Sequence, residues 1–184
     1  MKNNSYILPE DNPKNAAFNF KDKVMDKVDN TDLFNSYIKS ENFKQEYKGT
    51  LWAEGPCYVP NKDILIWSDI PNNRLLKLQN GTISEFINPS NYINGNTLDN
   101  EGNIISCSHG GRCVYKIEEN LNLLKLVDSF NYKKLNSPND VCVKSDNTIW
   151  FTDPPYGILS DYEGYPGKQE YNDCYVFRYN PKNN

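Results

Sequence analysis

The sequence has little histidine and no cysteine arrangement typical of a zinc site. His109 is the single histidine, and none of the five cysteines belongs to a Cys-X-X-Cys pair. A Cys/His zinc site is therefore not expected. The odd number of cysteines predicts free thiols rather than a disulfide framework, and we expect each of them to be buried and inert.

Three further absences narrow the class of protein. No apolar run approaches the roughly 20 residues that span a bilayer, and residues 1–10 contain no apolar core of signal-peptide length. The formal charge of -4 comes from acidic and basic residues mixed along the chain, so there is no basic stripe for nucleic acid. We expect a cytoplasmic protein that binds neither nucleic acid nor membranes.

The first 45 residues differ in composition from the rest and are rich in Lys, Asp and Asn. Their apolar residues hint at a short amphipathic helix, although the spacing is irregular. These residues are Val24, Val28, Leu33, Phe34, Tyr37 and Ile38. We therefore expect an N-terminal extension over residues 1–45 and one main domain over residues 46–184.

The main domain contains a repeat of short β-rich runs separated by Asn, Gly, Pro and Asp. Its three copies open at Glu54, Asn94 and Asn139, so successive copies are 40 and 45 residues apart. This is the length of a four-stranded propeller blade. The expected strands are 58–59, 64–67, 75–78 and 83–87 in the first copy, 97–98, 104–107, 114–117 and 123–127 in the second, and 141–143, 149–151 and 175–179 in the third. The sequence predicts an all-β partial propeller with blades at about 51–90, 91–130 and 135–184.

Propellers close into rings of four to eight blades, and fewer than three complete copies are present here. We expect either an N-terminal fragment of a longer protein or a chain that closes its ring with another chain. Open blade edges would also favour self-association.

The residues that open each copy are candidates for a metal site. The innermost strands of a propeller surround its central channel, so Glu54, Asn94 and Asn139 should face one another there. They offer one carboxylate and two amide carbonyls, the oxygen ligands that calcium prefers. Asn at a strand boundary is also a common turn former, but the shared register favours a site that holds a divalent cation.

A second set of equivalent residues ends the apolar strand of each copy: Asp69, His109 and Asp153. We expect the two aspartates to cap turns, whereas His109 is equally compatible with a polar site and with a loop. Two prolines follow Asp153 and stop the strand, which would hold Tyr156 at the mouth of the channel.

Several motifs together resemble one known family, the bacterial gluconolactonases, which share a superfamily with senescence marker protein, or regucalcin. The resemblance extends from about Leu51 to Tyr179. It rests on Trp52-Ala-Glu-Gly-Pro56, Trp67-Ser-Asp-Ile-Pro-Asn-Asn-Arg74, Asn94-Gly-Asn-Thr97, Ser108-His-Gly-Gly-Arg112, Leu135-Asn-Ser-Pro-Asn-Asp-Val141 and Trp150-Phe-Thr-Asp-Pro-Pro-Tyr-Gly157.

The resemblance implies a six-bladed propeller with a central divalent cation, usually calcium, that hydrolyses sugar lactones. It implies that Glu54 and Asn139 are metal ligands and that Asn94 lies in the metal and substrate environment. His109 and Tyr156 are then expected to contact the hydroxyl groups of the sugar. The family's general base is an Asp from a later blade, and no residue of this sequence matches it.

Other interpretations stay open at this stage. A related esterase or phosphotriesterase propeller would use similar metal chemistry on other substrates. A non-catalytic binding propeller would use the same polar residues only as turn caps, and a truncated gene product would be inactive. Pairing of two half-rings is a further possibility. Because calcium takes 6–8 oxygen ligands, we expect this chain alone to bind calcium weakly and to hydrolyse little or no lactone.

Overall fold

The computed structural model describes residues 44–183. Residues 50–183 belong to one compact unit and residues 44–49 to another, and all the described strands lie in the first. The amphipathic helix predicted between Val24 and Ile38 lies outside the described residues. Within the described part of the chain, no helix is long and apolar enough to cross a membrane.

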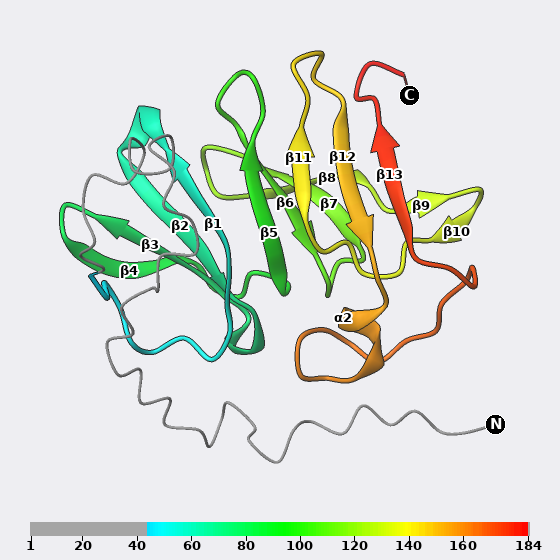
Figure 1. The fold of residues 1–184 in the computed structure, drawn as a ribbon, viewed down its shortest axis with the longest axis horizontal. Coiled ribbons are helices and arrows are strands. Elements are labelled where there is room, and N and C mark those ends of the chain that lie inside the picture. The colour runs from blue at the N-terminus through cyan, green and yellow to red at the C-terminus, as the bar shows by residue number, and fades with distance from the viewer. Residues whose placement is uncertain (1–43, 184) are drawn as a thin grey trace, which may run out of the picture. The chain divides into compact units, whose positions relative to one another are not determined.

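Three antiparallel sheets of three or four strands follow one another along the described chain, and the strands of each pair in chain order (Figure 1). The first sheet contains β1 (Ala53–Val59), β2 (Ile64–Asp69), β3 (Arg74–Gln79) and β4 (Thr82–Ile87). The second contains β5 (Ile93–Leu98), β6 (Ile104–Ser108), β7 (Cys113–Ile117) and β8 (Leu123–Val127). The third contains β11 (Val141–Val143), β12 (Ile149–Asp153) and β13 (Tyr175–Tyr179).

Short elements connect these strands. They are the 3₁₀ turns η1 (Pro60–Lys62) and η2 (Ile70–Asn72), the hairpin of β9 (Ser129–Phe130) and β10 (Lys133–Lys134), and the four-residue helix α2 (Tyr156–Leu159). The hairpin and α2 were not predicted. The helix follows the two prolines of the Asp-Pro-Pro-Tyr-Gly run and lies near the start of an insertion, residues 154–174, between β12 and β13.

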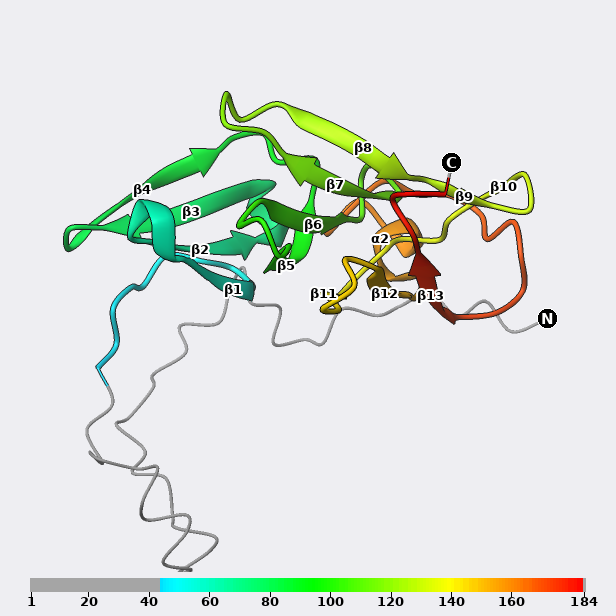
Figure 2. The same cartoon turned by 90° about the horizontal axis from the view of Figure 1, so that it is seen from above.

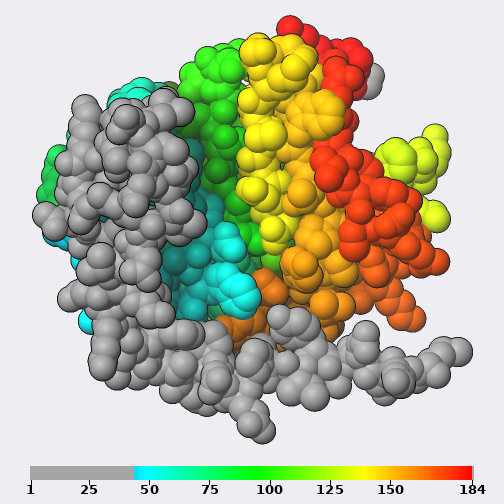
Figure 3. Space-filling model, viewed as in Figure 1, coloured from blue at the N-terminus to red at the C-terminus, as the bar shows by residue number. Residues whose placement is uncertain are grey.

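The innermost strands of the three sheets lie side by side. Seen from above, β1, β5 and β11 line one side of the unit, whereas β4 and β8 lie on the other (Figure 2). The strand β5 contacts both β1 and β11, and the surfaces of β5 and β11 adjoin in the space-filling view (Figure 3). The predicted all-β propeller fold is confirmed, with three successive sheets forming part of a ring.

Turns between the strands use residues that tolerate left-handed backbone conformations. Asp63 and Asn73 follow the two 3₁₀ turns with φ angles of 48° and 52°. Asn80 and Asn147 take the same conformation in later turns. Asn and Asp adopt positive φ more readily than other residues with a side chain. The Asn-rich composition between the β runs therefore has a direct structural role.

Two apolar clusters fill the spaces between neighbouring sheets. The first joins residues such as Ile66 and Leu75 of the first sheet to Ile104 of the second. The second joins Ile105, the next residue along β6, to Phe151 of the third sheet. Because successive side chains of a strand point to opposite faces, β6 is buried on both sides. This arrangement explains why all five of its residues are buried.

The cysteine prediction is only partly correct. All five cysteines are free thiols, as expected, and Cys57, Cys107 and Cys113 are buried. Burial raises the pKa of Cys113 to about 11, which keeps this thiol protonated and unreactive. The expectation of a buried thiol is wrong for Cys142 and Cys174, which are exposed. On β11, the residue before Cys142 is the buried Val141, and strand alternation therefore turns the Cys142 side chain away from the core.

Candidate functional site

Irregular pairing of the inner strands places the residues that open each copy. The pairing of β1 with β2 shifts between Glu54 and Cys57, and that of β5 with β6 shifts between Ile93 and Asn96. Bulges of this kind bend a strand and redirect its side chains. Glu54 is the last paired residue before the irregularity of β1, Asn94 lies within that of β5, and Asn139 lies two residues before β11.

Glycines next to these residues let neighbouring inner strands approach closely. A Cβ atom on Gly55, whose φ is +54°, would lie 2.7 Å from Asn96 Nδ2 and would also collide with the carbonyl oxygen of Asn94. A Cβ atom on Gly95 would lie 2.6 Å from the carbonyl oxygen of Asn139, which accepts a 2.8 Å hydrogen bond from Gly95 N–H. The two Gly residues after Glu54 and Asn94 thus bring each blade against the start of the next.

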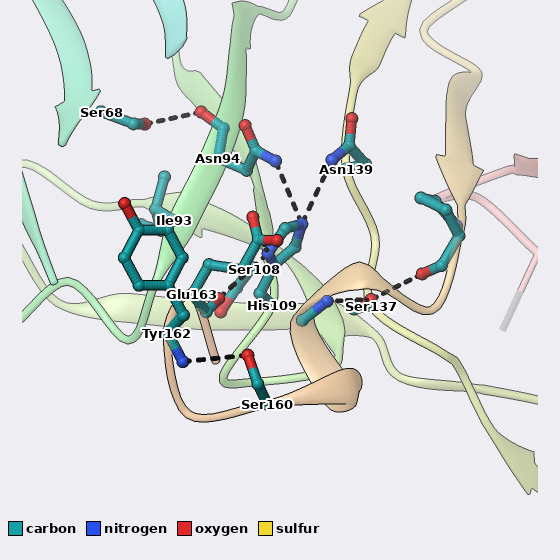
Figure 4. Close-up of polar contacts among 12 residues, drawn as sticks. Ser68, Ile93, Asn94, Ser108, His109, Ser137, Asn139, Ser160, Tyr162 and Glu163 are labelled. Carbon is teal, nitrogen blue, oxygen red and sulfur yellow. Dashed lines mark hydrogen bonds and ion pairs between the residues drawn. The ribbon is translucent and has the colours of Figure 1, made fainter. Parts of the chain in front are cut away.

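The single histidine lies beneath the two asparagines. His109 Nε2 is 3.0 Å from Asn94 Nδ2 and 3.2 Å from Asn139 Nδ2, and the His109 side chain is fully buried. Its Nδ1 is 3.0 Å from the carbonyl oxygen of Glu163. Figure 4 shows the nitrogen atoms of both amides directed at the imidazole and their oxygen atoms directed away from it.

The protonation state of this histidine follows from its burial. Burial lowers the pKa of His109 to about 4, and the hydrogen bond with the Glu163 carbonyl opposes this only partly. The ring is therefore neutral at pH 7 and carries one proton. That proton belongs on Nδ1, because the Glu163 carbonyl can only accept a hydrogen bond. Nε2 then accepts hydrogen bonds from Asn94 and Asn139.

The two amide oxygens remain available to a ligand. Among residues 44–183, no donor is hydrogen-bonded to the Oδ1 atom of Asn94 or Asn139. Neither atom is among the enclosed polar atoms of the described chain that lack a partner. The backbone of Asn94 is held as well, because its carbonyl oxygen accepts a 2.6 Å hydrogen bond from Ser68 Oγ. The site therefore presents amide oxygens outward on an ordered backbone.

Glu163 is a carboxylate that the sequence analysis missed. Its Oε2 lies 3.6 Å from His109 Nδ1. Burial raises the pKa of Glu163, and the negative charge of Glu54 raises it further. Glu163 thus lies close enough to Glu54 for their charges to interact. Because it belongs to the insertion between β12 and β13, outside the repeat, no register relation could have pointed to it.

The two aspartates of the second set are held by local hydrogen bonds. Asp69 is buried and accepts hydrogen bonds from the Leu51 backbone N–H at 2.9 Å and from Arg74 Nε at 2.9 Å. Asp153 is buried and accepts hydrogen bonds from the backbone N–H groups of Asn136 and Ser137 and from the Tyr171 hydroxyl. Both carboxylates bind backbone and side-chain donors of nearby turns, as the sequence analysis expects of turn caps.

The remaining predicted site residues differ in their surroundings. Glu54 is exposed on β1. Tyr156 is half exposed at the first position of α2, and among the described residues it forms no hydrogen bond with Asn94, Asn139 or His109. The structure brings Asn94, His109 and Asn139 into direct contact and adds Glu163, and Tyr156 has no hydrogen bond to the first three.

These residues suit a hard cation better than a soft one. In the described part of the chain, no group of three or more His, Cys, Asp or Glu side chains could hold a metal ion. A cation would therefore have to use amide oxygens together with carboxylates. Oxygen donors of this mixed kind are typical calcium ligands, and the outward Oδ1 atoms of Asn94 and Asn139 fit that requirement.

Comparison with known proteins identifies the family to which the chain belongs. Residues 52–182 match the family described as the SMP-30/gluconolactonase/LRE-like region. The chain belongs to this family, as the motifs in the sequence indicate.

Individual relatives support the same grouping. A gluconolactonase from Zymomonas mobilis is 31% identical over 145 residues, which cover 71% of this chain and 40% of that protein. The solved structure of a gluconolactonase from Xanthomonas campestris has a TM-score of 0.73 and 33% identity over 76% of this chain and 47% of its own. A structural-genomics protein provisionally named a gluconolactonase gives a TM-score of 0.71 and 42% identity over 73% of this chain and 47% of its own. The chain thus spans less than half the length of each of these relatives.

Proposed function

We propose that this chain forms part of a sugar-lactone hydrolase in which a divalent cation assists the attack of water on the lactone carbonyl. The observation that supports this proposal most directly is the pair of outward amide oxygens at Asn94 and Asn139. They lie next to β1, the strand that carries the Glu54 carboxylate. The gluconolactonase relatives, at 31–42% identity, support lactones as the substrate class.

Each residue has a defined part in this proposal. Glu54, Asn94 and Asn139 would hold the cation, which from the chemistry of its ligands is calcium. Bound there, the cation would supply a Lewis acid for the carbonyl oxygen of the lactone. The attacking water needs a carboxylate to remove its proton, and no residue of this chain is assigned that part.

Two of the three residues predicted to contact the substrate keep that role in the proposal. Asn94 lies next to the cation position and would also reach the substrate. Tyr156 is half exposed and remains a candidate for contact with a sugar hydroxyl. His109 is buried with both ring nitrogens engaged, so it has no free polar atom to offer to a sugar. We therefore expect His109 to support the amides of Asn94 and Asn139 and not to contact the substrate.

The isolated chain is expected to be a weak catalyst. The three proposed ligand side chains supply about half of the 6–8 oxygen atoms that calcium takes. Only one of them carries a charge. We therefore expect weak calcium binding and slow turnover from the 184-residue chain alone.

A hydrolysis assay tests the proposal. Gluconolactone hydrolysis is followed at high concentrations of the chain, with calcium and with a chelator, against the spontaneous rate. We expect a small acceleration that requires calcium, disappears in Glu54→Gln and persists in the matched control Glu119→Gln, since Glu119 is exposed in the turn between β7 and β8. Lack of any calcium-dependent acceleration or lactone binding would contradict the proposal.

A substrate panel separates the neighbouring functions. Aryl esters and phosphotriesters that react faster than lactones would favour the esterase or phosphotriesterase alternative. Binding of a lactone that is unchanged by Glu54→Gln and Asn139→Ala would favour a non-catalytic propeller. Rapid turnover by a verified monomer would leave the lactonase function in place but overturn the expectation of weak activity.

A further inference from the structure

The imidazole of His109 is held at both of its ring nitrogens and packs against the backbone of Gly157. Two amides lie on Nε2 and one carbonyl on Nδ1. The backbone of Gly157 lies against the ring, because a Cβ atom there would be 2.5 Å from His109 Cγ and 2.9 Å from Nδ1. Only a residue without a side chain leaves room for the ring at that place.

The insertion between β12 and β13 is built around this ring. Gly164 packs on Gly157, because a Cβ atom on Gly164 would collide with the carbonyl oxygen of Gly157. The same oxygen accepts a 3.0 Å hydrogen bond from Tyr165 N–H. The segment between these glycines also carries Glu163, whose carbonyl oxygen accepts the Nδ1 proton. Residues outside the repeat therefore enclose the histidine and set its tautomer.

We propose that His109 is a positioning residue that orients the side-chain amides of Asn94 and Asn139 so that both oxygens face the ligand. The inference rests on the proposed function for the identity of that ligand, a divalent cation. The orientation itself is a property of this chain alone.

The physical argument is one of donor and acceptor complementarity. A carboxamide has a donor side and an acceptor side of nearly equal size, so sterics alone do not choose between its two flipped orientations. With its proton on Nδ1, the imidazole offers only a lone pair at Nε2. That lone pair accepts from an NH₂ group and repels a carbonyl oxygen, so one nitrogen atom selects the orientation of both amides.

In many metal sites, a residue that does not touch the metal orients a ligand by a hydrogen bond. Loss of such an orienting partner typically lowers metal affinity about 10–100-fold. His109→Leu removes the acceptor and should weaken cation binding by about that factor. His109→Gln keeps an acceptor oxygen near the position of Nε2 and should retain binding within a few-fold of the unaltered chain.

Nuclear magnetic resonance of the ¹⁵N-labelled chain tests the orientation without any metal. We expect the His109 ring to be neutral at pH 7 with the proton on Nδ1, and its Nε2 to show through-hydrogen-bond coupling to the side-chain nitrogens of Asn94 and Asn139. A proton on Nε2, or no coupling to either amide, would overturn the inference.

Terbium luminescence then measures cation binding by the same chain and its variants. Tb³⁺ serves as the probe because it is an oxygen-seeking ion and needs no catalytic turnover. We expect His109→Leu to lose affinity and His109→Gln to retain it. Gly157→Ala, which pushes on the ring, should also lose affinity, whereas Gly167→Ala should not, since the nearest atoms to a Cβ there lie at 3.5 Å.

The outcomes separate the two proposals. If His109→Leu is folded by thermal melting and binds Tb³⁺ as the unaltered chain does, the positioning role is wrong. If His109→Leu fails to fold, the comparison of Gly157→Ala with Gly167→Ala and the tautomer of the unaltered chain decide the question. If the unaltered chain shows the expected tautomer and coupling but binds no Tb³⁺, the orientation is supported and the metal part of the proposed function fails.

Discussion

The buried histidine should make the stability of this protein fall as the pH is lowered. The folded-state pKa of His109 is about 4, whereas an unfolded histidine has a pKa near 6.5. Between these values the unfolded chain takes up a proton that the folded chain rejects. The stabilisation is therefore fully present above pH 6.5 and is lost progressively as the pH falls toward 4.

The size of the effect follows from the two pKa values. At 1.36 kcal/mol for each unit of pKa, the linkage relation gives a loss of about 2 kcal/mol between pH 7.5 and pH 5. Because His109 is the only histidine of the chain, no second imidazole contributes to this change.

Two carboxyl groups act in the opposite direction. Burial raises the pKa of Glu163 and of Asp153, so each favours the folded state as the pH falls. The pH profile of the unaltered chain alone therefore mixes opposing contributions. The difference between the unaltered chain and His109→Gln isolates the histidine.

Urea denaturation at pH 7.5, 6.0 and 5.0 provides the measurement. We expect the free energy of unfolding of the unaltered chain to fall by about 2 kcal/mol more than that of His109→Gln over this range. The absolute stability of the variant does not matter, because only the change with pH is compared. Parallel profiles for the two proteins would refute the assignment of a neutral, buried histidine.

Three other predictions concern single side chains of the same unit. Asp69→Asn places an NH₂ group against N–H donors whose hydrogen bonds the buried carboxylate now accepts. It should lower the free energy of unfolding by about 2–3 kcal/mol in urea denaturation. The control Asp63→Asn, at an exposed turn, should change this free energy by less than about 0.5 kcal/mol. Gly95→Ala should be destabilising and Gly167→Ala nearly neutral in thermal melting, because only the first new Cβ atom would meet backbone, at 2.6 Å; equal melting temperatures would contradict the close approach of β5 and β11. Glu54→Gln should weaken Tb³⁺ binding without lowering the melting temperature, since Glu54 is exposed, and a matching loss of stability would mean that Glu54 has a structural part instead.

Much of the fold was predictable because its determinants are local. The strands β2, β8 and β13 begin and end within two residues of the expected ranges, since alternating apolar residues and turn formers mark them directly. The repeat also related Glu54 on β1, Asn94 on β5 and Asn139, two residues before β11, to one another. Equivalent positions of successive blades must meet in any propeller, and spacing alone was enough to relate them.

The insertion and the small elements were not predictable in the same way. Residues 154–174 have no counterpart in the other copies, so no comparison within the chain could assign α2 or locate Glu163 beside His109. The exposure of Cys142 depended on which face of a short strand meets the core. The packing of the neighbouring sheet decides which face is buried, and the sequence of the strand alone does not.

The sequence by itself determined the repeat, the order of the strands and the three polar residues that open the copies, because each depends on spacing and on the local preferences of turns and strands. Only the tertiary structure decided which atoms of those residues face outward. The orientation of an amide depends on what lies behind it, and here that is His109, 15 residues from Asn94 and 30 from Asn139. Its tautomer depends in turn on a carbonyl 54 residues further along the chain. Contacts across such separations exist only once the blades have packed.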